Sequence, residues 1–467
     1  MKSDKLQNAI GGIDYDLIIR SEAPIGRKKR YSLISAIAAV LVLAIGIGIF
    51  AGNPGYTVYA GDMIAVYPTM APFPERPYDS EAYAAWNADQ KTRERYFGQG
   101  KHMEYFIRAT VGKILLGDGE NLVYSPVNLY LALAMLAESS EGNTRRQLLD
   151  LLGASNIKTL RRRANAIWNA NYNDDGATSS ILASSLWLNE AYSYHKETLE
   201  ILRDSYYASS YQGIMGSEAF EEALRTWLNE QTGGLLSDEI DSVRLSPETV
   251  MAIATTVYFR AKWTSEFSEG NTQEAVFHGT GGDTSVEFMN QKYDGYFCSG
   301  NQFSAVSKKL DGSGNVWFVL PDEGVCVNDL LKDGNALSFL SATDDSKRKT
   351  EATIHLSVPK FSVTSKFDLK ESLENLGVTD CFDEDRADFS ALVSGEDPVY
   401  VGKVEHSVSV DIDESGFQGA AYTVLATYGG GYETPDKEVF FTADRPFLFV
   451  VTGEDGTVVF IGVVQQL

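Results

Sequence analysis

The chain of 467 residues has only three cysteines, and their spacing excludes the common structural uses of cysteine. Cys298, Cys326 and Cys381 form no CxxC pair and no metal-binding box, so we predict neither a disulfide scaffold nor a metal site. We expect all three to be small buried hydrophobic residues. We expect the protein to be a monomer. Because the number of cysteines is odd, at least one thiol is then unpaired. No cofactor is expected.

Positive charge is also scarce, and its deficit excludes one class of partner. The chain has 40 Lys and Arg against 64 Asp and Glu, a formal net charge of −24. Residues 1–50 are the exception, with seven basic and four acidic side chains. Because neutralising phosphates requires Lys and Arg, we expect no nucleic-acid partner. The acidic surface is most simply a solvated one.

Catalytic signatures are absent as well. The sequence contains no G-x-S-x-G elbow, no H-E-x-x-H helix and no EF-hand loop. The five histidines have no local catalytic partners; they stand at His102, His195, His278, His355 and His406. His406 follows the alternating pattern of a strand, which is typical of a structural core histidine. We therefore expect that the protein is not an enzyme.

One long apolar run is present near the N-terminus. Residues 31–50 hold no charge over 20 positions, and a helix of that length spans about 30 Å, the thickness of a bilayer core. Four basic residues, 27–30, directly precede the run. The positive-inside rule predicts a single transmembrane anchor at 31–50, with 1–30 cytoplasmic and the rest extracellular. A cleaved signal peptide is the alternative, although its apolar region is usually shorter.

The remainder divides into a short stalk and one large domain. Residues 51–100 contain five prolines, which favour an extended stalk, part of which is expected to pack on the domain behind it. From residue 101 to 467 helical patterns come first, at 102–116 and 127–137, and strand patterns come later. The strands are expected at 316–320, 352–358 and 447–451. This order predicts an α+β domain with large antiparallel sheets.

A long exposed loop follows one strand near the C-terminus. Residues 408–412 alternate like a strand, and an acidic stretch then leads into glycines, alanines and a Gly-Gly-Gly tip at 429–431. The small residues indicate a segment that must fit into a narrow space after it leaves solvent.

This loop and many motifs of residues 101–467 resemble the serpins, in the order that the family has them. The matching segments are 121–126, 132–136, 142–148, 227–234, 258–263, 318–321, 359–361, 376–378, 387–390 and 444–449. We identify the chain as a member of this family, and the transmembrane run suggests a bacterial, membrane-anchored one. The resemblance implies a serpin fold with an exposed reactive-centre loop, and a function as a serine protease inhibitor.

The resemblance implies an inhibitor that a target protease attacks as a substrate. The enzyme forms its acyl intermediate on the loop, and the cut loop enters the main sheet as a new strand and distorts the enzyme. The hinge of this loop is implied at Glu414, Gly416, Phe417, Gly419, Ala420, Ala421 and Thr423. Phe417 departs from the family, whose inhibitors usually have Thr or Ser there. A non-inhibitory serpin-like surface protein with a binding or chaperone role therefore remains the alternative.

The family also places a polar pocket, the shutter, under the site of loop insertion. Ser125 and His406 match it, while Asn128 stands where the family has Ser and Thr255 where it has Asn. The amide and the hydroxyl are thus exchanged, with the same hydrogen-bonding inventory. The resemblance further places Trp263 at the breach, where the loop would enter the sheet.

Family spacing from Glu414 places the reactive-centre bond between Gly430 and Gly431. Glycine has no side chain for a specificity pocket, so Tyr428 and Tyr432 are the specificity candidates. No Lys or Arg lies between 414 and 436, which excludes a trypsin-like target. We expect a chymotrypsin-, subtilisin- or elastase-like serine protease as partner.

Overall fold

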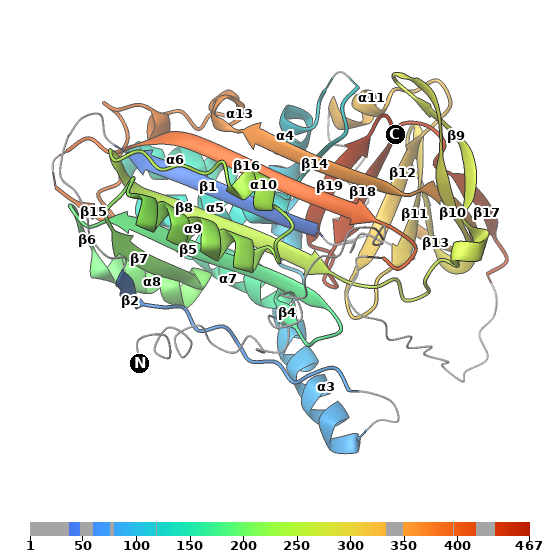
Figure 1. The fold of residues 1–467 in the computed structure, drawn as a ribbon, viewed down its shortest axis with the longest axis horizontal. Helices are drawn as coiled ribbons and strands as arrows, with labels where there is room; N and C mark the ends of the chain where they lie inside the picture. The colour runs from blue at the N-terminus through green and yellow to red at the C-terminus, as the bar shows by residue number, and fades with distance from the viewer. Residues whose placement is uncertain are drawn as a thin grey trace, which may run out of the picture.

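The computed structural model describes residues 37–46, 59–74, 79–117, 119–332, 349–395, 397–416 and 435–467. Two large sheets lie beside each other, with helices on both faces of the first (Figure 1). A third sheet consists of β6 (Ser193–Tyr194) and β15 (Val393–Ser394). The apolar core is continuous from the helices into both sheets, so the described residues from α4 (Glu104–Ile114) to the C-terminus form one folded unit.

The first sheet, which we call the main sheet, carries the candidate site. Its strands, in spatial order, are β14 (Phe361–Asp368), β16 (Tyr400–Ile412), β1 (Ile37–Gly46), β8 (Thr249–Arg260), β5 (Ser179–Asn189), β7 (Ala208–Gly213) and β2 (Tyr59–Met63), with β4 (Asn173–Asp174) beside β5. Neighbouring strands are antiparallel except β5 and β7.

The second sheet packs at one end of the main sheet. Its spatial order is β17 (Glu438–Thr442), β13 (Lys349–Pro359), β10 (Gly282–Ser299), β11 (Phe303–Lys309), β12 (Asn315–Pro321), β18 (Phe447–Thr452), β19 (Val458–Val464) and β3 (Leu122–Tyr124), with β9 (Gln273–Gly279) beside β10. β13 and β17 run parallel. Each of the two large sheets has one parallel pairing, so they are mixed sheets and not wholly the large antiparallel sheets that were expected.

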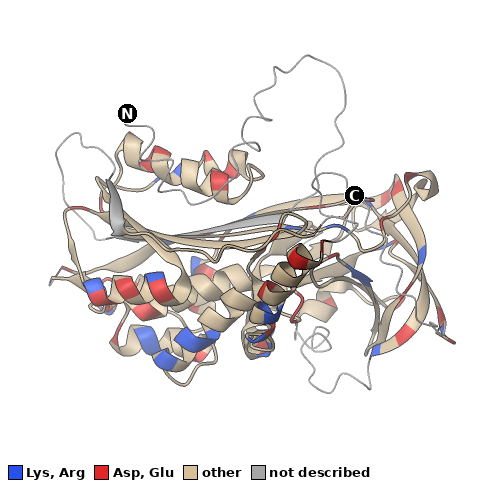
Figure 2. Cartoon of the chain, turned by 90° about the horizontal axis from the view of Figure 1, so that it is seen from below, with Lys and Arg blue, Asp and Glu red and all other residues tan. Residues whose placement is uncertain are grey.

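The helices cover the main sheet unequally. They are α3 (Ser80–Glu94), α4 (Glu104–Ile114), α5 (Pro126–Ser139), α6 (Gly142–Leu151), α7 (Ile157–Asn171), α8 (Lys196–Tyr206), α9 (Glu218–Gln231), α10 (Ser237–Ile240), α11 (Val327–Lys332) and α13 (Lys370–Asn375), with 3-10 turns η1 (Gly100–Met103), η2 (Glu269–Asn271) and η5 (Asp380–Phe382). α9 and α10 lie on the opposite face from α5 to α7 (Figure 1). Positions with Lys, Arg, Asp or Glu are concentrated on the helices and the outer strands, and much of the main sheet carries residues of other types (Figure 2).

The expected helices and strands of the domain are confirmed. The run at 127–137 is α5, which begins after the N-cap Ser125 and is buried along its whole length, as an apolar helix with no polar face must be. The three strands expected from the sequence are β12, β13 and β18. Cys298 and Cys381 are buried, but Cys326 is exposed, so the prediction for that cysteine is wrong.

The expected extended stalk differs from the structure. Residues 59–63 form the edge strand β2, and residues 80–94 form helix α3. Between them Tyr67 packs on Trp168 and Tyr207, with ring centroids 5.4 and 6.2 Å away. Aromatic burial of this kind outweighs the extended preference that the prolines give. The prediction of an extended stalk is therefore wrong for residues 59–63 and 80–94, which form a strand and a helix, while the packing on the domain that was expected for part of the stalk is seen at Tyr67.

The apolar run at 31–50 also differs from its prediction over the part described. Residues 37–46 form strand β1 of the main sheet, while 31–36 and 47–50 lie outside the described residues, as do 1–30. An apolar run without charged positions satisfies a buried strand as well as a helix, so periodicity cannot separate the two. Among the described residues, no helix is both long and apolar enough to cross a membrane.

Candidate functional site: the hinge and the shutter of the main sheet

The candidate site begins where β16 ends and the loop departs. Residues 413–416 are described, and the loop itself, 417–434, lies outside the described residues. The predictions for the following residues therefore fall there: Phe417, Gly419, Ala420, Ala421, Thr423, Tyr428, Gly430, Gly431 and Tyr432. The hinge residues Glu414 and Gly416, the breach and the shutter are all described.

Trp263 holds the hinge at the breach, as the resemblance implies. Its indole Nε1 donates to the carbonyl oxygen of Asp413 at 2.9 Å, and its backbone N–H donates to Ser415 at 3.2 Å. The Trp263 side chain is buried and packs edge-on against Phe267, whose N–H donates to the carbonyl of Glu414 at 2.9 Å. Three donors from one short segment thus fix the backbone of the hinge.

Glu414 is fixed through its side chain as well. Its carboxylate accepts from the Thr272 hydroxyl at 2.7 Å and lies 2.8 Å from the Lys360 ammonium. Burial opposes ionisation, but these hydrogen bonds outweigh it and hold the pKa of Glu414 below its ordinary value. The ionised hinge glutamate is therefore clamped between the breach and the start of β14.

We expect Glu414→Gln to lower the free energy of unfolding by about 1–3 kcal/mol at pH 7, since it removes a charge-assisted bond from a buried site. Because the folded pKa lies below the unfolded one, this contribution is complete above pH 4.5 and disappears as the pH falls through the folded pKa. Denaturant unfolding at pH 7 and pH 3 measures it. Glu287→Gln is the control, because Glu287 also pairs with Lys360 but is largely exposed. Equal effects of the two variants would contradict the prediction.

A buried lysine under the breach was missed by the sequence reasoning. Lys308 on β11 is 1% exposed and lies 4.4 Å from the ring centroid of Phe267 and 5.3 Å from that of Trp263. Its ammonium donates to the carbonyl of Ser265 at 2.7 Å and also to the side chain of Gln291. Burial lowers the pKa of Lys308 to about 7, while the aromatic faces favour the cation.

Lys308→Met should therefore remove a pH dependence of stability. The unfolded lysine binds its proton up to pH 10.5 and the folded one only to about 7, so the free energy of unfolding rises with pH between these values, by about 1.4 kcal/mol per pH unit. Urea unfolding from pH 7 to 10 should show this slope in the parent and not in the variant. Lys309→Met, at the neighbouring exposed position, should keep the slope. A slope that survives Lys308→Met would assign it to another group.

The structure brings the four shutter residues together. The backbone N–H of Ser125 donates to His406 Nε2 at 3.1 Å, and the Ser125 hydroxyl donates to the carbonyl of Val459 at 2.7 Å. Asn128 Nδ2 donates to the carbonyl of Thr255 at 3.4 Å. Ser125, Asn128, Thr255 and His406 are all buried. The polar pocket expected from the resemblance is thus present beneath the main sheet.

Two polar atoms of this pocket are not satisfied. Asn128 Oδ1 and Thr255 Oγ1 are buried and have no hydrogen-bond partner among the described residues. Buried polar atoms normally have partners, so such a pair marks a place that another group can complete. Thr255 and His406 are the residues that flank β1 at the register position of Leu41.

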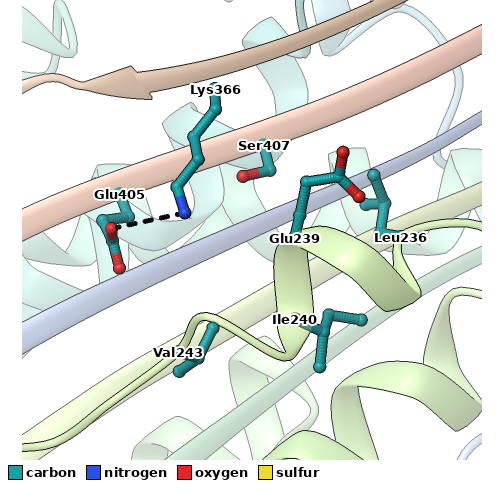
Figure 3. A pocket seen from close by; sticks show the side chains of 7 residues that line it. All are labelled: Leu236, Glu239, Ile240, Val243, Lys366, Glu405 and Ser407. Atoms are coloured by element: carbon teal, nitrogen blue, oxygen red, sulfur yellow. Dashed lines mark ion pairs between the residues drawn. The ribbon is translucent and has the colours of Figure 1, made fainter.

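Helix α10 and the residues beside it lie over β14 and β16 of the main sheet. Leu236, Ile240 and Val243 form one wall of a narrow pocket, and Lys366, Glu405 and Ser407 of β14 and β16 form the other, with β1 passing beneath (Figure 3). Lys366 lies 3.9 Å from Glu405. A strand between β8 and β16 therefore runs under this cover.

Comparisons with known proteins agree with this geometry. The family model described as serpin (serine protease inhibitor) matches residues 110–467, so the chain belongs to the serpin family. Serpin-ZX of Arabidopsis thaliana is 28% identical over 364 residues, covering 74% of this chain and 92% of that protein. An uncharacterized serpin-like protein of Thermococcus kodakarensis is 27% identical over 413 residues, covering 86% and 94%.

Solved structures show the same fold. The thermophilic serpin tengpin in its native state has a TM-score of 0.67 at 24% identity, over 86% of this chain and 98% of that one. Human thyroxine-binding globulin complexed with thyroxine has a TM-score of 0.65 at 19% identity, over 79% and 99%. These likenesses confirm the serpin fold.

Proposed function

We propose that this serpin inhibits serine endopeptidases as a suicide substrate. The observation that carries the proposal is the hinge, in which Trp263, Phe267, Thr272 and Lys360 hold the start of the loop at the end of β16. A protease that cuts the loop forms an acyl-enzyme, and the freed strand enters the main sheet beside β16. About a dozen new ladder bonds, roughly 0.5–1.5 kcal/mol each, supply the energy that distorts the bound enzyme. The protein itself turns nothing over.

We propose Gly430–Gly431 as the nominal reactive-centre bond, with Tyr428 and Tyr432 as specificity residues and with cleavage after either tyrosine by an enzyme that binds its ring. An apolar pocket holds tyrosine, whereas a trypsin-like pocket requires a cation. The target is therefore a chymotrypsin-, subtilisin- or elastase-like enzyme.

The proposed location is the cell membrane, with residues 31–50 as a single anchor and the serpin domain outside. The basic residues before the apolar run support this orientation. Protease added to intact cells should then remove the domain from the surface. A domain that stays protected, or one found free with an N-terminus near residue 51, would argue against the anchor.

A non-inhibitory binding role is the second candidate, and Phe417 favours it. A bulky ring that enters a packed sheet costs about 1–3 kcal/mol, which slows insertion. The fold of thyroxine-binding globulin, whose structure was solved with thyroxine, is compatible with such a role. Phe417→Thr should increase inhibition if the ring is the obstacle.

The inhibitory function is tested with the full chain reconstituted in phosphatidylcholine vesicles. After incubation with chymotrypsin, subtilisin or elastase, we expect a complex that survives boiling in SDS and contains the enzyme and the N-terminal part of the chain. Heat-inactivated enzyme is the control. Complete cleavage of the loop with no such complex for any of the three enzymes would favour the binding role.

A further inference from the structure

Strand β1 occupies a particular place in the main sheet. It lies between β8 and β16 and is antiparallel to both, from Ile37, which pairs with Val410 and Phe259, to Gly46 at the other end (Figure 1). β8 and β16 are consequently parallel to each other and separated by two strand spacings, about 9.6 Å. That gap has room for one strand and not for two.

The described end of the hinge lies at the mouth of the same gap. Gly416 forms two isolated antiparallel β-bridges. One is with Asp413, just after β16, and the other is with Lys262, just after β8. A chain that turns here and returns along β16 runs antiparallel to it, as β1 does. Continuing the register of the Asp413–Gly416 bridge would bring residue 423 opposite His406, and residues 419–429 opposite 410–400. These are the rows of β16 that β1 now fills.

We propose that residues 37–46 are an intramolecular competitor of the loop, so that the chain with β1 in its sheet cannot trap a protease. This inference rests on the proposed inhibitory function. Two segments of one chain then share one slot, and only one of them can use the ladder hydrogen bonds of β8 and β16. If residues 31–50 span a membrane, β1 is withdrawn and the slot is open to the loop. Inhibition is thereby coupled to membrane insertion.

The connection from β1 to the domain permits this arrangement. Gly46 pairs with Thr249, and Tyr59, the next described residue, pairs with Gln212 of β7, near the same end of the sheet. The distance from β1 to β2 is four strand spacings, about 19 Å. The thirteen peptide links from Gly46 to Tyr59 can span about 40 Å when extended. A tether of this length keeps β1 at a high effective concentration beside its slot.

The shutter is not fully hydrogen-bonded among the described residues while β1 is in the sheet. Leu41, at the row of Thr255 and His406, has no hydrogen-bonding side chain, and Asn128 Oδ1 and Thr255 Oγ1 stay without partners among the described residues. Residue 423, which the bridge register would bring to this row, is a threonine. Its hydroxyl could complete the pocket. β1 is therefore a replaceable occupant and not a permanent strand of the sheet.

Disulfide trapping tests the place of β1 in the full chain. In a Cys326→Ser background, the in-register pairs are Ala38→Cys with Ser409→Cys and Ala39→Cys with Val408→Cys. The off-register controls are Ala38→Cys with Val408→Cys and Ala39→Cys with Ser409→Cys. In each control the two cysteines project from opposite faces of the sheet. In the lipid-free chain we expect a disulfide in at least one in-register pair and in neither control. Absence of the bond from both in-register pairs, or equal yields in the controls, overturns the proposal.

The competition between β1 and the loop is tested in phosphatidylcholine vesicles, with whichever in-register variant forms its disulfide. We expect the disulfide yield to fall at least tenfold in vesicles, and trapping of protease to rise at least tenfold over the lipid-free chain. Oxidised variant formed before reconstitution should trap no protease, and reduction should restore trapping. Equal trapping by oxidised and reduced chains overturns the competition. If the reduced chain traps no protease in vesicles, the proposed inhibitory function is wrong, and the competition is then wrong as well. The disulfide yields still show whether β1 lies beside β16.

Discussion

Replacing Tyr428 and Tyr432 together by alanine is expected to slow trapping of chymotrypsin at least 100-fold. Tyr428 and Tyr432 are the only aromatic side chains close to the Gly430–Gly431 bond, so an enzyme with an apolar primary pocket can fill that pocket only by cutting after one of them. Burying such a ring contributes about 3 kcal/mol, which corresponds to a factor of roughly 100 in association with the enzyme. The rate is measured from the loss of chymotrypsin activity over time, with the serpin in vesicles.

Tyr422→Ala is the matched control for this experiment, since it removes a tyrosine of the same loop eight residues before the bond. Its effect on the trapping rate should be less than threefold. Trypsin should form no stable complex with the parent or with either variant. A covalent trypsin complex, or trapping that survives the double substitution, would show that the tyrosines do not set specificity.

The second large effect is expected for Gly416→Ala at the hinge. Gly416 has a φ of +105°, and a Cβ built there would lie 2.6 Å from the backbone N of Trp263. Both the strained backbone and the steric overlap oppose a side chain, because Trp263 cannot move without losing its bonds to Asp413 and Ser415. We expect a loss of about 2–4 kcal/mol in the free energy of unfolding.

Gly377→Ala separates the two causes. Gly377 has a φ of +90° but open space around it, so its substitution measures backbone strain alone. We expect about 1 kcal/mol for this control. Denaturant midpoints of both variants give the comparison. If the two losses are equal, the contact with Trp263 contributes nothing and the hinge is looser than the structure shows.

The sequence could predict the parts of the site whose residues follow a repeated local pattern. α5 was predictable because Ser125-Pro126 precedes an unbroken apolar run, and Ser125 is indeed its N-cap. The shutter and hinge were found because the motif residues stand in family order, although they meet only in the folded chain. Hydrogen bonds between Glu414, Thr272 and Lys360 join segments more than fifty residues apart, which no local pattern records.

Two features could not be predicted in this way. The run at 31–50 fits the pattern of a membrane helix and that of a buried strand, and the strand seen at residues 37–46 depends on pairing with β8 and β16, which lie far away in the sequence. Lys308 stands in a Lys-Lys pair that would ordinarily be solvated. One signal for its burial was available, because Lys308 alternates with Val306 and Leu310, which are both buried. Its hydrogen-bond partners lie on other segments of the chain, so no local pattern indicates them.

The docking of residues 59–63 as β2 also affects how copies of the protein behave at high concentration. An exposed sheet edge can template the addition of a strand from another chain, which is a route to aggregation. β2 covers β7 at one edge of the main sheet and is only five residues long, with a glycine and an aspartate in it. At the other edge, β14 exposes Ser362, Thr364 and Lys366. Both borders of the sheet are thus short or polar, which keeps neighbouring molecules from joining edge to edge.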